Sequence, residues 1–303
     1  MRTIDQNTIT DAAIEQMAAT ANPRFKEIME ALVRHLHEFA REVDLTAGEW
    51  LEGIRFLTAV GQKCTEHRQE FILLSDTLGF SSLVNALHDR RSTAAGTKTS
   101  LLGPFYRRDS LPMPLGASIV SDKNKPQICV YGQVLNSSGE PIPNASVEVW
   151  QPDDEGNYDL QKPNASEMDL RGRFLTDAEG RYYLRTVAPC GYMIPMDGPV
   201  GDMIRAQRRH GYRPAHIHFL VGASQYREVV TALYFRGDDH IESDTVFGVT
   251  DSLIIDLKAH DSSSPIPGLP SIHFDFRLAA STPKAASGRV GADPSQLISR
   301  NEG

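Results

Sequence analysis

Cysteine is scarce in this chain of 303 residues, which contains only Cys64, Cys129 and Cys190. A sparse, odd number without close spacing argues against a disulfide framework or a thiolate zinc site, and is typical of reduced thiols in a cytosolic protein. Basic residues are outnumbered, and the formal net charge of −8 argues against a nucleic-acid partner. No apolar run approaches the ~20 residues that span a bilayer, and the N-terminus lacks the apolar segment of a secretory signal. We therefore expect a cytoplasmic protein with no membrane insertion.

The first third of the chain lacks strand periodicity and has the pattern of helices. Apolar residues recur every three to four positions over residues 25–43, 50–57 and 71–87, as they do on one face of a helix. Thr46 and Glu49 have the spacing of a capping box, which marks the start of the second segment. The apolar faces are expected to pack in a core or in a subunit contact.

From about residue 125 the apolar period changes to two. Alternating stretches occur over residues 128–134, 145–149, 181–185 and 229–234, and Gly, Asn or Asp turns separate them. Several short strands with such turns predict an antiparallel sandwich or barrel.

Helices first and strands second predict an α+β protein with segregated domains. We expect a helical N-terminal domain over residues 1–100 and a β-sandwich domain over residues 101–280. Residues 281–303 are rich in Ser, Ala, Gly and Pro, and are predicted to form a loose tail.

Two histidines, His216 and His218, occupy alternate positions of a predicted strand. Both imidazoles then point to one face of the strand, while Ile217 and Phe219 point to the other. Imidazole is a common ligand for iron, copper and zinc. The pair alone also fits two polar residues on a solvated strand face, so a metal site needs further ligands.

Candidates for those ligands are two aspartates and two tyrosines. Asp197 or Asp202 would complete a 2-His-1-carboxylate ferrous site, but neither lies in an obvious strand with the histidines. Tyr158 and Tyr192 each lie in turn-rich segments. A phenol has a pKa near ~10, so it binds as phenolate only to a strongly acidic cation such as ferric iron. Each tyrosine, taken alone, is better explained as a rim residue whose hydroxyl is hydrogen-bonded.

Taken together, these residues lie in motifs that resemble those of the intradiol ring-cleaving dioxygenases, which use non-haem iron(III). The resemblance covers nearly the whole chain. Its motifs are Leu101–Tyr106, Pro141–Ala145 with Tyr158, Arg171–Phe174, Thr176–Asp177, Asp197–Gly201, Arg213–His218 and Gly237–Asp238.

The resemblance implies one Fe(III) per subunit, held by Tyr158, Tyr192, His216 and His218. It implies a trigonal-bipyramidal centre with Tyr192 and His218 axial and hydroxide as the fifth ligand. It also implies a homodimer formed by the N-terminal helical domain, in some members around a bound phospholipid. The C-terminal sandwich would then be the catalytic domain.

The reaction implied is cleavage of a catechol-type diol by O2 between the two hydroxyl-bearing carbons, which gives a cis,cis-muconic acid. Tyr192 is expected to take part in the loss of the substrate's protons. Arg213 remains positively charged and is expected to stabilise negative charge on the ring, although a surface arginine is the simpler alternative.

The segment over residues 69–79 resembles the branch of the family that acts on hydroxyquinol (benzene-1,2,4-triol). In that branch, residues matching Leu73 and Asp76 line the pocket, whereas many catechol enzymes have proline at the aspartate position. A third ring hydroxyl in an apolar pocket needs a partner, and a carboxylate can accept its hydrogen bond. The less favoured alternative for Asp76 is a solvated helix residue or a cap. We predict hydroxyquinol as substrate and 3-hydroxy-cis,cis-muconate (maleylacetate) as product, with catechol or chlorocatechol as the alternative.

Further residues are assigned to the pocket by motif, and two positions depart from the expected pattern. Ala232 stands where catechol enzymes commonly have glutamine, and Leu102 stands where the hydroxyquinol branch leads us to expect a larger aromatic residue. Both would widen the pocket for substituted substrates. The additional expected substrate-binding residues are Leu101, Leu102, Gly103, Pro104, Phe105, Ile194, Pro195 and Val246.

Two other classes remain as alternatives. A β-sandwich binding module without chemistry would contain no iron. A zinc hydrolase is disfavoured because the chain lacks an H-E-x-x-H motif with its carboxylate base. Degradation of aromatic compounds in a bacterium or fungus is the natural setting for the predicted enzyme.

Overall fold

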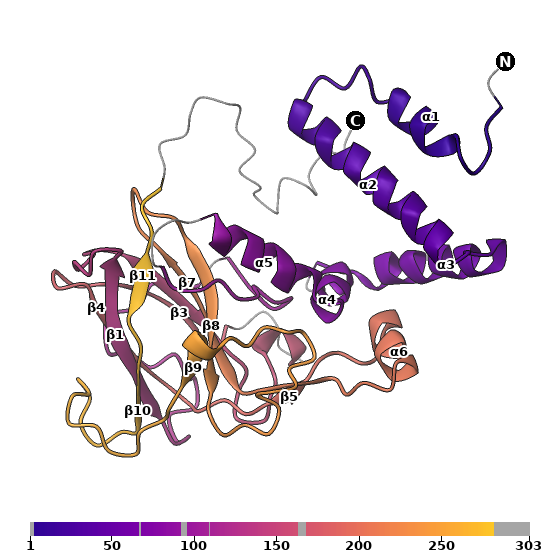
Figure 1. The fold of residues 1–303 in the computed structure, drawn as a ribbon. Helices are drawn as coiled ribbons and strands as arrows, with labels where there is room; N and C mark the ends of the chain where they lie inside the picture. The colour runs from indigo at the N-terminus through magenta and orange to yellow at the C-terminus, as the bar shows by residue number, and fades with distance from the viewer. Residues whose placement is uncertain (1–2, 67, 92–95, 109, 163–167, 282–303) are drawn as a thin grey trace. The chain divides into compact units, whose positions relative to one another are not determined.

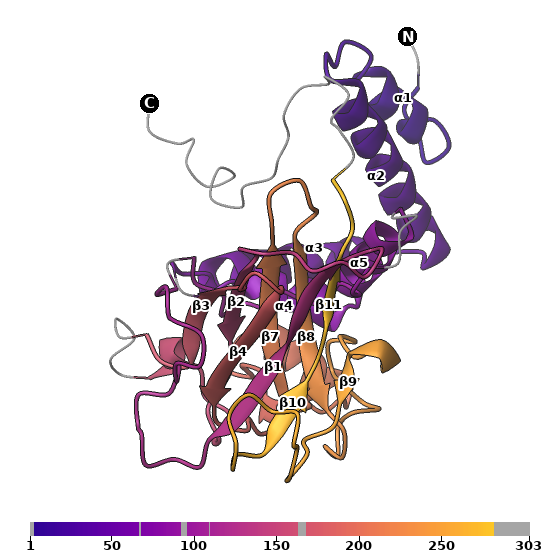
Figure 2. The same ribbon diagram turned by 90° about the vertical axis from the view of Figure 1, so that its left-hand side faces the viewer.

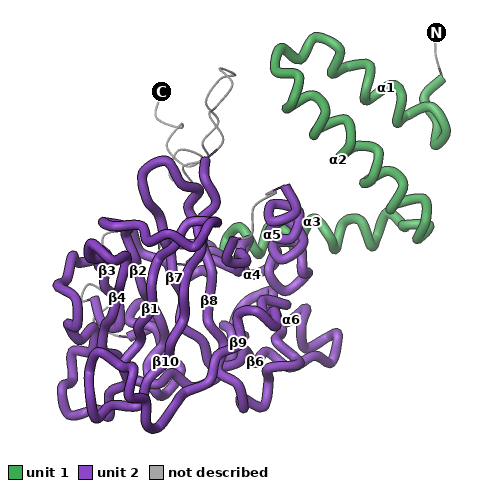
Figure 3. The backbone as a smooth tube through the Cα atoms, turned by 60° about the vertical axis from the view of Figure 1, so that its left-hand side comes forward, with its two compact units in different colours: residues 1–62 green, residues 63–303 purple. Residues whose placement is uncertain are grey.

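The computed structural model describes residues 3–66, 68–91, 96–108, 110–162 and 168–281. The chain forms two compact units, Met1–Gln62 and Lys63–Gly303 (Figure 3). This boundary lies before the predicted division at residue 100, and Ser82 bonds within the second unit, where its Oγ donates to Val246 O. The predicted tail lies outside the described residues apart from Ser281.

The first unit is helical, as predicted. Asn22 begins the long second helix by accepting a hydrogen bond from Phe25 N, with Pro23 in the first turn. Thr46 and Glu49 form the predicted capping box, with Thr46 N 2.9 Å from Glu49 Oε2 and Glu49 N 3.3 Å from Thr46 Oγ1. Across the described residues, no helix is both long and apolar enough to cross a bilayer. The helices are α1 (Ile9–Glu15), α2 (Pro23–Glu42) and α3 (Ala47–Lys63).

Among its described residues, the second unit contains the helices α4 (Glu70–Thr77), α5 (Phe80–Arg90) and α6 (Pro199–Ala206) (Figure 1). Gly79 separates α4 from α5 with a φ of +73°, a left-handed conformation that glycine adopts without strain. The fully buried Glu70 carboxylate accepts a hydrogen bond from Val200 N at the start of α6. This contact places α4 beside the segment that follows Tyr192.

Two sheets make up most of the second unit (Figures 1 and 2). Two short strands pair in a separate ribbon. The first sheet contains β1 (Ile128–Asn136), β4 (Arg181–Thr186), β10 (Ser271–His273) and β11 (Phe276–Leu278). The second contains, in spatial order, β3 (Arg171–Leu175), β2 (Ser146–Trp150), β7 (His216–Gly222), β8 (Val229–Phe235) and β9 (Ile254–Ile255), and the ribbon is β5 (Tyr192–Met193) with β6 (Tyr212–Arg213).

The α+β class is confirmed, and the sheets are mixed rather than wholly antiparallel. β10 and β11 pair with β1 in parallel, and β9 pairs with β8 in parallel. A two-residue hairpin can join only antiparallel strands, whereas a long connection can return the chain in the same direction. Residues 236–253, between β8 and β9, form such a connection.

The two sheets share one apolar core, as in a sandwich. Phe219 of β7 and Phe276 of β11 come from opposite sheets, and their ring centroids are 5.0 Å apart. Ile217 is also fully buried in this core. Because side chains alternate along a strand, His216 and His218 lie on the outer face of the five-stranded sheet. That face carries the site.

Candidate metal centre

His216 and His218 bring their imidazoles together in the protein interior. Their Nε2 atoms are 3.1 Å apart, and both residues are almost fully buried. His216 Nδ1 lies 2.7 Å from Pro214 O and donates to it, so Nε2 carries a lone pair. Burial, and then the charge of Arg213, lower the pKa of both histidines well below the usual value. Both are therefore neutral, which is the form that binds metals.

Tyr158 and Tyr192 bring their rings to the same place. The Tyr158 hydroxyl is 3.5 Å from His216 Nε2, and the ring centroids of the two tyrosines are 5.6 Å apart. The Tyr192 ring is also 5.6 Å from that of His216. Burial raises the pKa of Tyr158 well above 10, with the neighbouring Tyr192 adding to the rise. Ionisation of so buried a phenol requires a strong cation beside it.

The donor set fits ferric iron. Two neutral imidazoles and two phenol oxygens converge there, and phenolate is a ligand for hard, strongly acidic cations. Asp197 pairs instead with Arg68 at 2.8 Å, which lowers its pKa to about 2, and Asp202 pairs with Arg205. Within the described part of the chain, no group of three or more His, Cys, Asp and Glu could hold a metal. A 2-His-1-carboxylate or thiolate site therefore has no support there.

Arg213 places a buried positive charge beside these four residues. It lies opposite Tyr192 in the ribbon of β5 and β6. Its Nη1 is 3.1 Å from His216 Nε2 and 3.5 Å from the Tyr192 hydroxyl. Only 3% of the residue is exposed. The prediction that Arg213 belongs to the site, rather than to the surface, agrees with this position.

Two predicted pocket residues lie against the cluster. The ring of Phe105 stacks on Tyr158, with centroids 4.5 Å apart. Gly103 has a φ of +72°, and a Cβ there would lie 3.5 Å from His218 Nε2. The segment Leu101–Phe105 therefore forms one wall of the site.

Asp76 is buried in α4 with an exposed fraction of 3%. Burial raises its pKa to about 6, while a hydrogen bond from Ser81 and the charge of Arg213 act in the opposite direction and Asp244 adds to the rise. Asp76 is thus within electrostatic reach of Arg213, and the alternative of a solvated helix residue is excluded.

The remaining predicted pocket residues differ in exposure. Leu73, Leu101, Ile194 and Val246 are buried. Leu102, Pro104 and Pro195 are partly exposed.

Comparisons with known proteins agree with this geometry. The family model described as "Dioxygenase" matches residues 107–280, and that described as "Catechol dioxygenase N terminus" matches residues 22–96. The chain belongs to the intradiol dioxygenases. It is 44% identical to a 6-chlorohydroxyquinol 1,2-dioxygenase from Cupriavidus pinatubonensis, over 92% of this chain and 99% of the relative. It is also 44% identical to a hydroxyquinol 1,2-dioxygenase from a Rhizobium species, over 89% and 94% of the two chains.

Solved structures show the same relationship. The structure of a hydroxyquinol 1,2-dioxygenase from Pseudomonas putida superposes with a TM-score of 0.82 at 43% identity, covering 91% of this chain and 99% of that one. The fold of this dioxygenase is therefore that of the family throughout both predicted domains.

The two departures noted in the sequence both lie at the centre of this dioxygenase. Ala232 is fully buried and lies opposite His218 in the pairing of β7 with β8, so its methyl group shares the histidine's face of the sheet. Leu102 packs against the buried cluster that includes Phe105 and Tyr158. Short or flexible side chains therefore stand at two positions beside the Tyr/His cluster.

Three residues beside the site carried no functional signal in the sequence. Trp150 ends β2 and stacks on His218, with centroids 5.0 Å apart and rings nearly parallel. The Tyr234 hydroxyl lies 3.4 Å from Arg213 Nη2, and Asp244 forms an ion pair with Arg213. Period-two alternation places Trp150 and Tyr234 on a face of the sheet, but only strand pairing puts that face beside the histidines.

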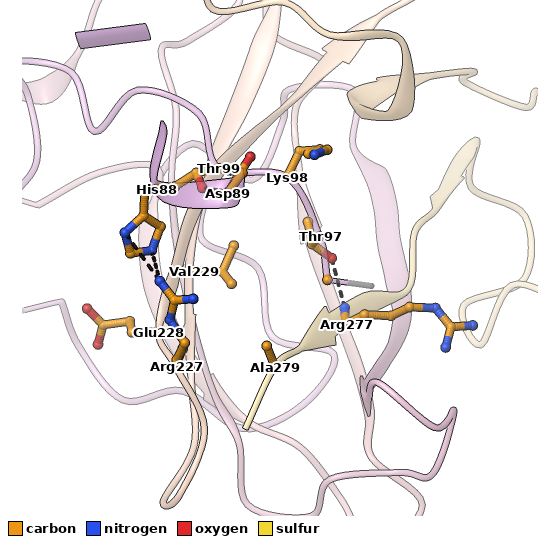
Figure 4. Close-up of a pocket in the computed structure, with 11 residues that line it drawn as sticks. His88, Asp89, Thr97, Lys98, Thr99, Arg227, Glu228, Val229, Arg277 and Ala279 are labelled. Atoms are coloured by element: carbon orange, nitrogen blue, oxygen red, sulfur yellow. Dashed lines mark hydrogen bonds between the residues drawn. The ribbon is translucent and has the colours of Figure 1, made fainter. Parts of the chain in front are cut away.

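A separate cavity of about 290 Å³ lies among the end of α5, residues 96–99, and the ends of β8 and β11 (Figure 4). His88 contacts Arg227 there, and Asp89 bonds Thr99. None of the predicted site residues lines it. The cavity is distinct from the Tyr/His cluster.

Proposed function

We propose that this dioxygenase cleaves hydroxyquinol with O2 between its adjacent hydroxyl-bearing carbons and releases 3-hydroxy-cis,cis-muconate, which is maleylacetate in its keto form. The observation that carries the proposal is the buried carboxyl group of Asp76, within electrostatic reach of Arg213. A buried carboxylate can accept more hydrogen bonds than the one from Ser81, and a third ring hydroxyl supplies a further donor. Relatives that bear the name hydroxyquinol 1,2-dioxygenase add support.

One ferric ion per subunit would be held by Tyr158, Tyr192, His216 and His218. When bound, the ion supplies a Lewis acid toward the two adjacent oxygens of the diol. The neutral imidazoles and the paired phenols support this assignment.

Three side chains stabilise the charge of the ring, take up a substrate proton and bind the third hydroxyl. Arg213 stabilises negative charge that develops on the ring, because its guanidinium is buried and stays protonated. Tyr192 takes up a substrate proton, a role for which it is the less buried of the two tyrosines. Asp76 accepts the hydrogen bond of the third hydroxyl.

The walls of the pocket exclude water and hold the ring. The proposed wall residues are Leu73, Leu101, Leu102, Gly103, Pro104, Phe105, Ile194, Pro195 and Val246. Water-free surroundings strengthen the interaction between Arg213 and a charged ring.

A second candidate is cleavage of catechol or a chlorocatechol to the corresponding cis,cis-muconate. It is favoured by the small side chain of Ala232 opposite His218, which leaves room for a ring substituent. The two candidates share the centre and differ in whether Asp76 has a substrate hydroxyl to bind.

Oxygen uptake by the iron-loaded protein with hydroxyquinol and catechol in parallel tests the proposal. We expect a coloured, tyrosinate-type protein that consumes oxygen mainly with hydroxyquinol.

In Asp76→Ala, kcat/KM for hydroxyquinol should fall ~10–100-fold, since a buried hydroxyl loses its partner, while kcat/KM for catechol should change less than ~3-fold. Asp202→Asn, an exposed aspartate of α6, is the control. Equal losses on both substrates would refute the role of Asp76, and an inert protein that binds no iron would refute the centre.

We also propose that the protein is a homodimer and that residues 1–100 act together as its dimerisation domain, although the compact units divide between Gln62 and Lys63. The apolar residues of α2 support a dimer through the N-terminal helices, because Ile28, Leu32, Leu36 and Phe39 recur on one face and are each about half exposed. Leu36→Glu should convert a dimer to a monomer in light scattering. A phospholipid on this face would be detected by mass spectrometry of a solvent extract.

We also propose a cytoplasmic location, which the reduced thiols of Cys64, Cys129 and Cys190 support.

A further inference from the structure

We propose that Asp244 is a positioning residue that aims the guanidinium of Arg213 at the Tyr/His cluster. The inference rests on the proposed role of Arg213 in ring cleavage. It adds a residue of the 236–253 connection to the machinery of the site.

The Asp244 carboxylate binds the edge of the guanidinium formed by Nε and Nη2, and makes no bond to Nη1. Its Oδ1 lies 3.2 Å from Arg213 Nε, and its Oδ2 lies 3.4 Å from Nη2. The remaining nitrogen, Nη1, is the one that faces His216 Nε2 and the Tyr192 hydroxyl. Because guanidinium is planar and rigid, holding the Nε–Nη2 edge fixes where Nη1 points.

The carboxylate is itself held by the backbone. Asp244 Oδ1 accepts a hydrogen bond from Val246 N at 3.3 Å, and Oδ2 accepts one from Gly248 N at 2.9 Å. Each oxygen therefore has one backbone donor and one guanidinium donor. These bonds oppose rotation of the carboxylate, and they tie Arg213 to the turn that carries the pocket residue Val246.

The Tyr234 hydroxyl makes a further contact with the Arg213–Asp244 pair. Arg213 Nη2 lies 3.4 Å from the Tyr234 hydroxyl, which lies 2.8 Å from Ser100 Oγ. A Cβ at Gly248 would lie 2.5 Å from the Tyr234 hydroxyl, 3.1 Å from Asp244 Oδ2 and 3.2 Å from Arg213 Nη2. The absence of a side chain at Gly248 thus lets the three polar groups meet.

The charge of Asp244 is as relevant as its shape. Both side chains of the pair are about 3% exposed, so neither charge is solvated by bulk water. A buried cation without a counter-charge moves toward whatever acceptor is available. Without the Asp244 charge, we expect the Arg213 guanidinium to move away from the position where it faces the negative charge that develops on the substrate ring. A displacement of ~1 Å can lower the rate ~100-fold.

A double-mutant cycle of Asp244→Asn and Arg213→Ala tests the inference. Steady-state oxygen uptake is measured with hydroxyquinol and with catechol, and the cycle is evaluated with the substrate that the unaltered protein cleaves. Iron content, thermal unfolding and anaerobic binding of the same diol are measured for every variant. Asp177→Asn is the matched control, since Asp177 also bonds two turn N–H groups and pairs with an arginine, Arg181, but in the β3–β4 turn.

We expect Asp244→Asn to lower kcat ~30–100-fold with the dissociation constant of the diol changed less than ~3-fold and iron content unchanged. In the Arg213→Ala background the same substitution should lower kcat less than ~2-fold, because it acts through the arginine. Equal losses in both backgrounds would show a general structural role and overturn the inference. Wild-type kcat in Arg213→Ala would instead overturn the proposed role of the arginine itself.

Gly248→Ala keeps both charges and provides a second test should Asp244→Asn fail to fold. The added methyl group displaces the Tyr234 hydroxyl, the Asp244 carboxylate and the Arg213 guanidinium from one another. We therefore expect kcat to fall at least ~10-fold in the wild-type background and less than ~2-fold in the Arg213→Ala background. A Gly248→Ala protein that binds iron and turns over at the wild-type rate would overturn the inference.

Discussion

Replacing Asp76 by asparagine should stabilise the protein at neutral pH, although the change removes a charge from the proposed site. Asp76 has an exposed fraction of 3%, and burial is the main cause of its raised pKa. The carboxylate form is therefore the one that the folded state disfavours. Asparagine has nearly the same shape and carries no charge to desolvate.

The magnitude follows from the change in the Asp76 pKa. A rise from 3.8 in the unfolded chain to about 6 in the folded protein corresponds to ~3 kcal/mol at ~1.36 kcal/mol per pKa unit. Because the folded pKa is the higher one, the folded state binds the proton more tightly, and wild-type stability falls as pH rises between the two values. The advantage of Asp76→Asn should be ~1.6 kcal/mol at about pH 5 and reach its full ~3 kcal/mol above about pH 7.

Urea unfolding of both iron-loaded proteins between pH 5 and 7.5 provides the measurement. The informative quantity is the difference in unfolding free energy between variant and wild type, since effects of pH on other groups cancel in it. Asp202→Asn shows the effect of removing an exposed carboxylate. A difference for Asp76→Asn that stays constant between pH 5 and 7.5 would refute the reasoning, as would a variant less stable than wild type at pH 7.5.

Three further predictions concern the centre and its pocket. Tyr158→Phe should bind less than ~0.1 iron per chain by metal analysis, because the substitution removes a ligand oxygen. The control is Tyr182→Phe, since Tyr182 is also buried but its hydroxyl donates to the backbone carbonyl of Phe274, and this variant should keep its iron. Equal iron content in the two variants would contradict the ligand assignment. The KM for hydroxyquinol should rise as pH falls through about 6, because the protonated carboxyl group of Asp76 is a weaker hydrogen-bond acceptor. The KM for catechol should show no such rise. Parallel pH profiles for the two substrates would count against the role of Asp76 in binding the third hydroxyl. Gly103→Ala should destabilise the protein by ~1–2 kcal/mol through its positive φ; an unchanged melting temperature would contradict the strain.

The sequence determined the metal-ligand candidates through local geometry. Alternation along a strand is a property of the extended backbone, so the His-x-His spacing placed His216 and His218 on one face before any partner strand was known. The capping box at Thr46 was likewise a local pattern and is confirmed. Tyr158 and Tyr192 were assigned through the order of family motifs, and the structure brings both to the histidines.

Only the tertiary structure decided how distant segments meet. Asp244 follows Arg213 by 31 residues and lies in an irregular connection, where no periodicity predicts which way a side chain points. The parallel strands β9, β10 and β11 depend on long connections in the same way. Backbone geometry acts between neighbours in the chain, and it therefore leaves a pattern in the sequence. Burial of Asp76 and pairing of Arg213 with Asp244 depend on which surfaces come together when the chain closes, and that is set by the packing of the whole unit.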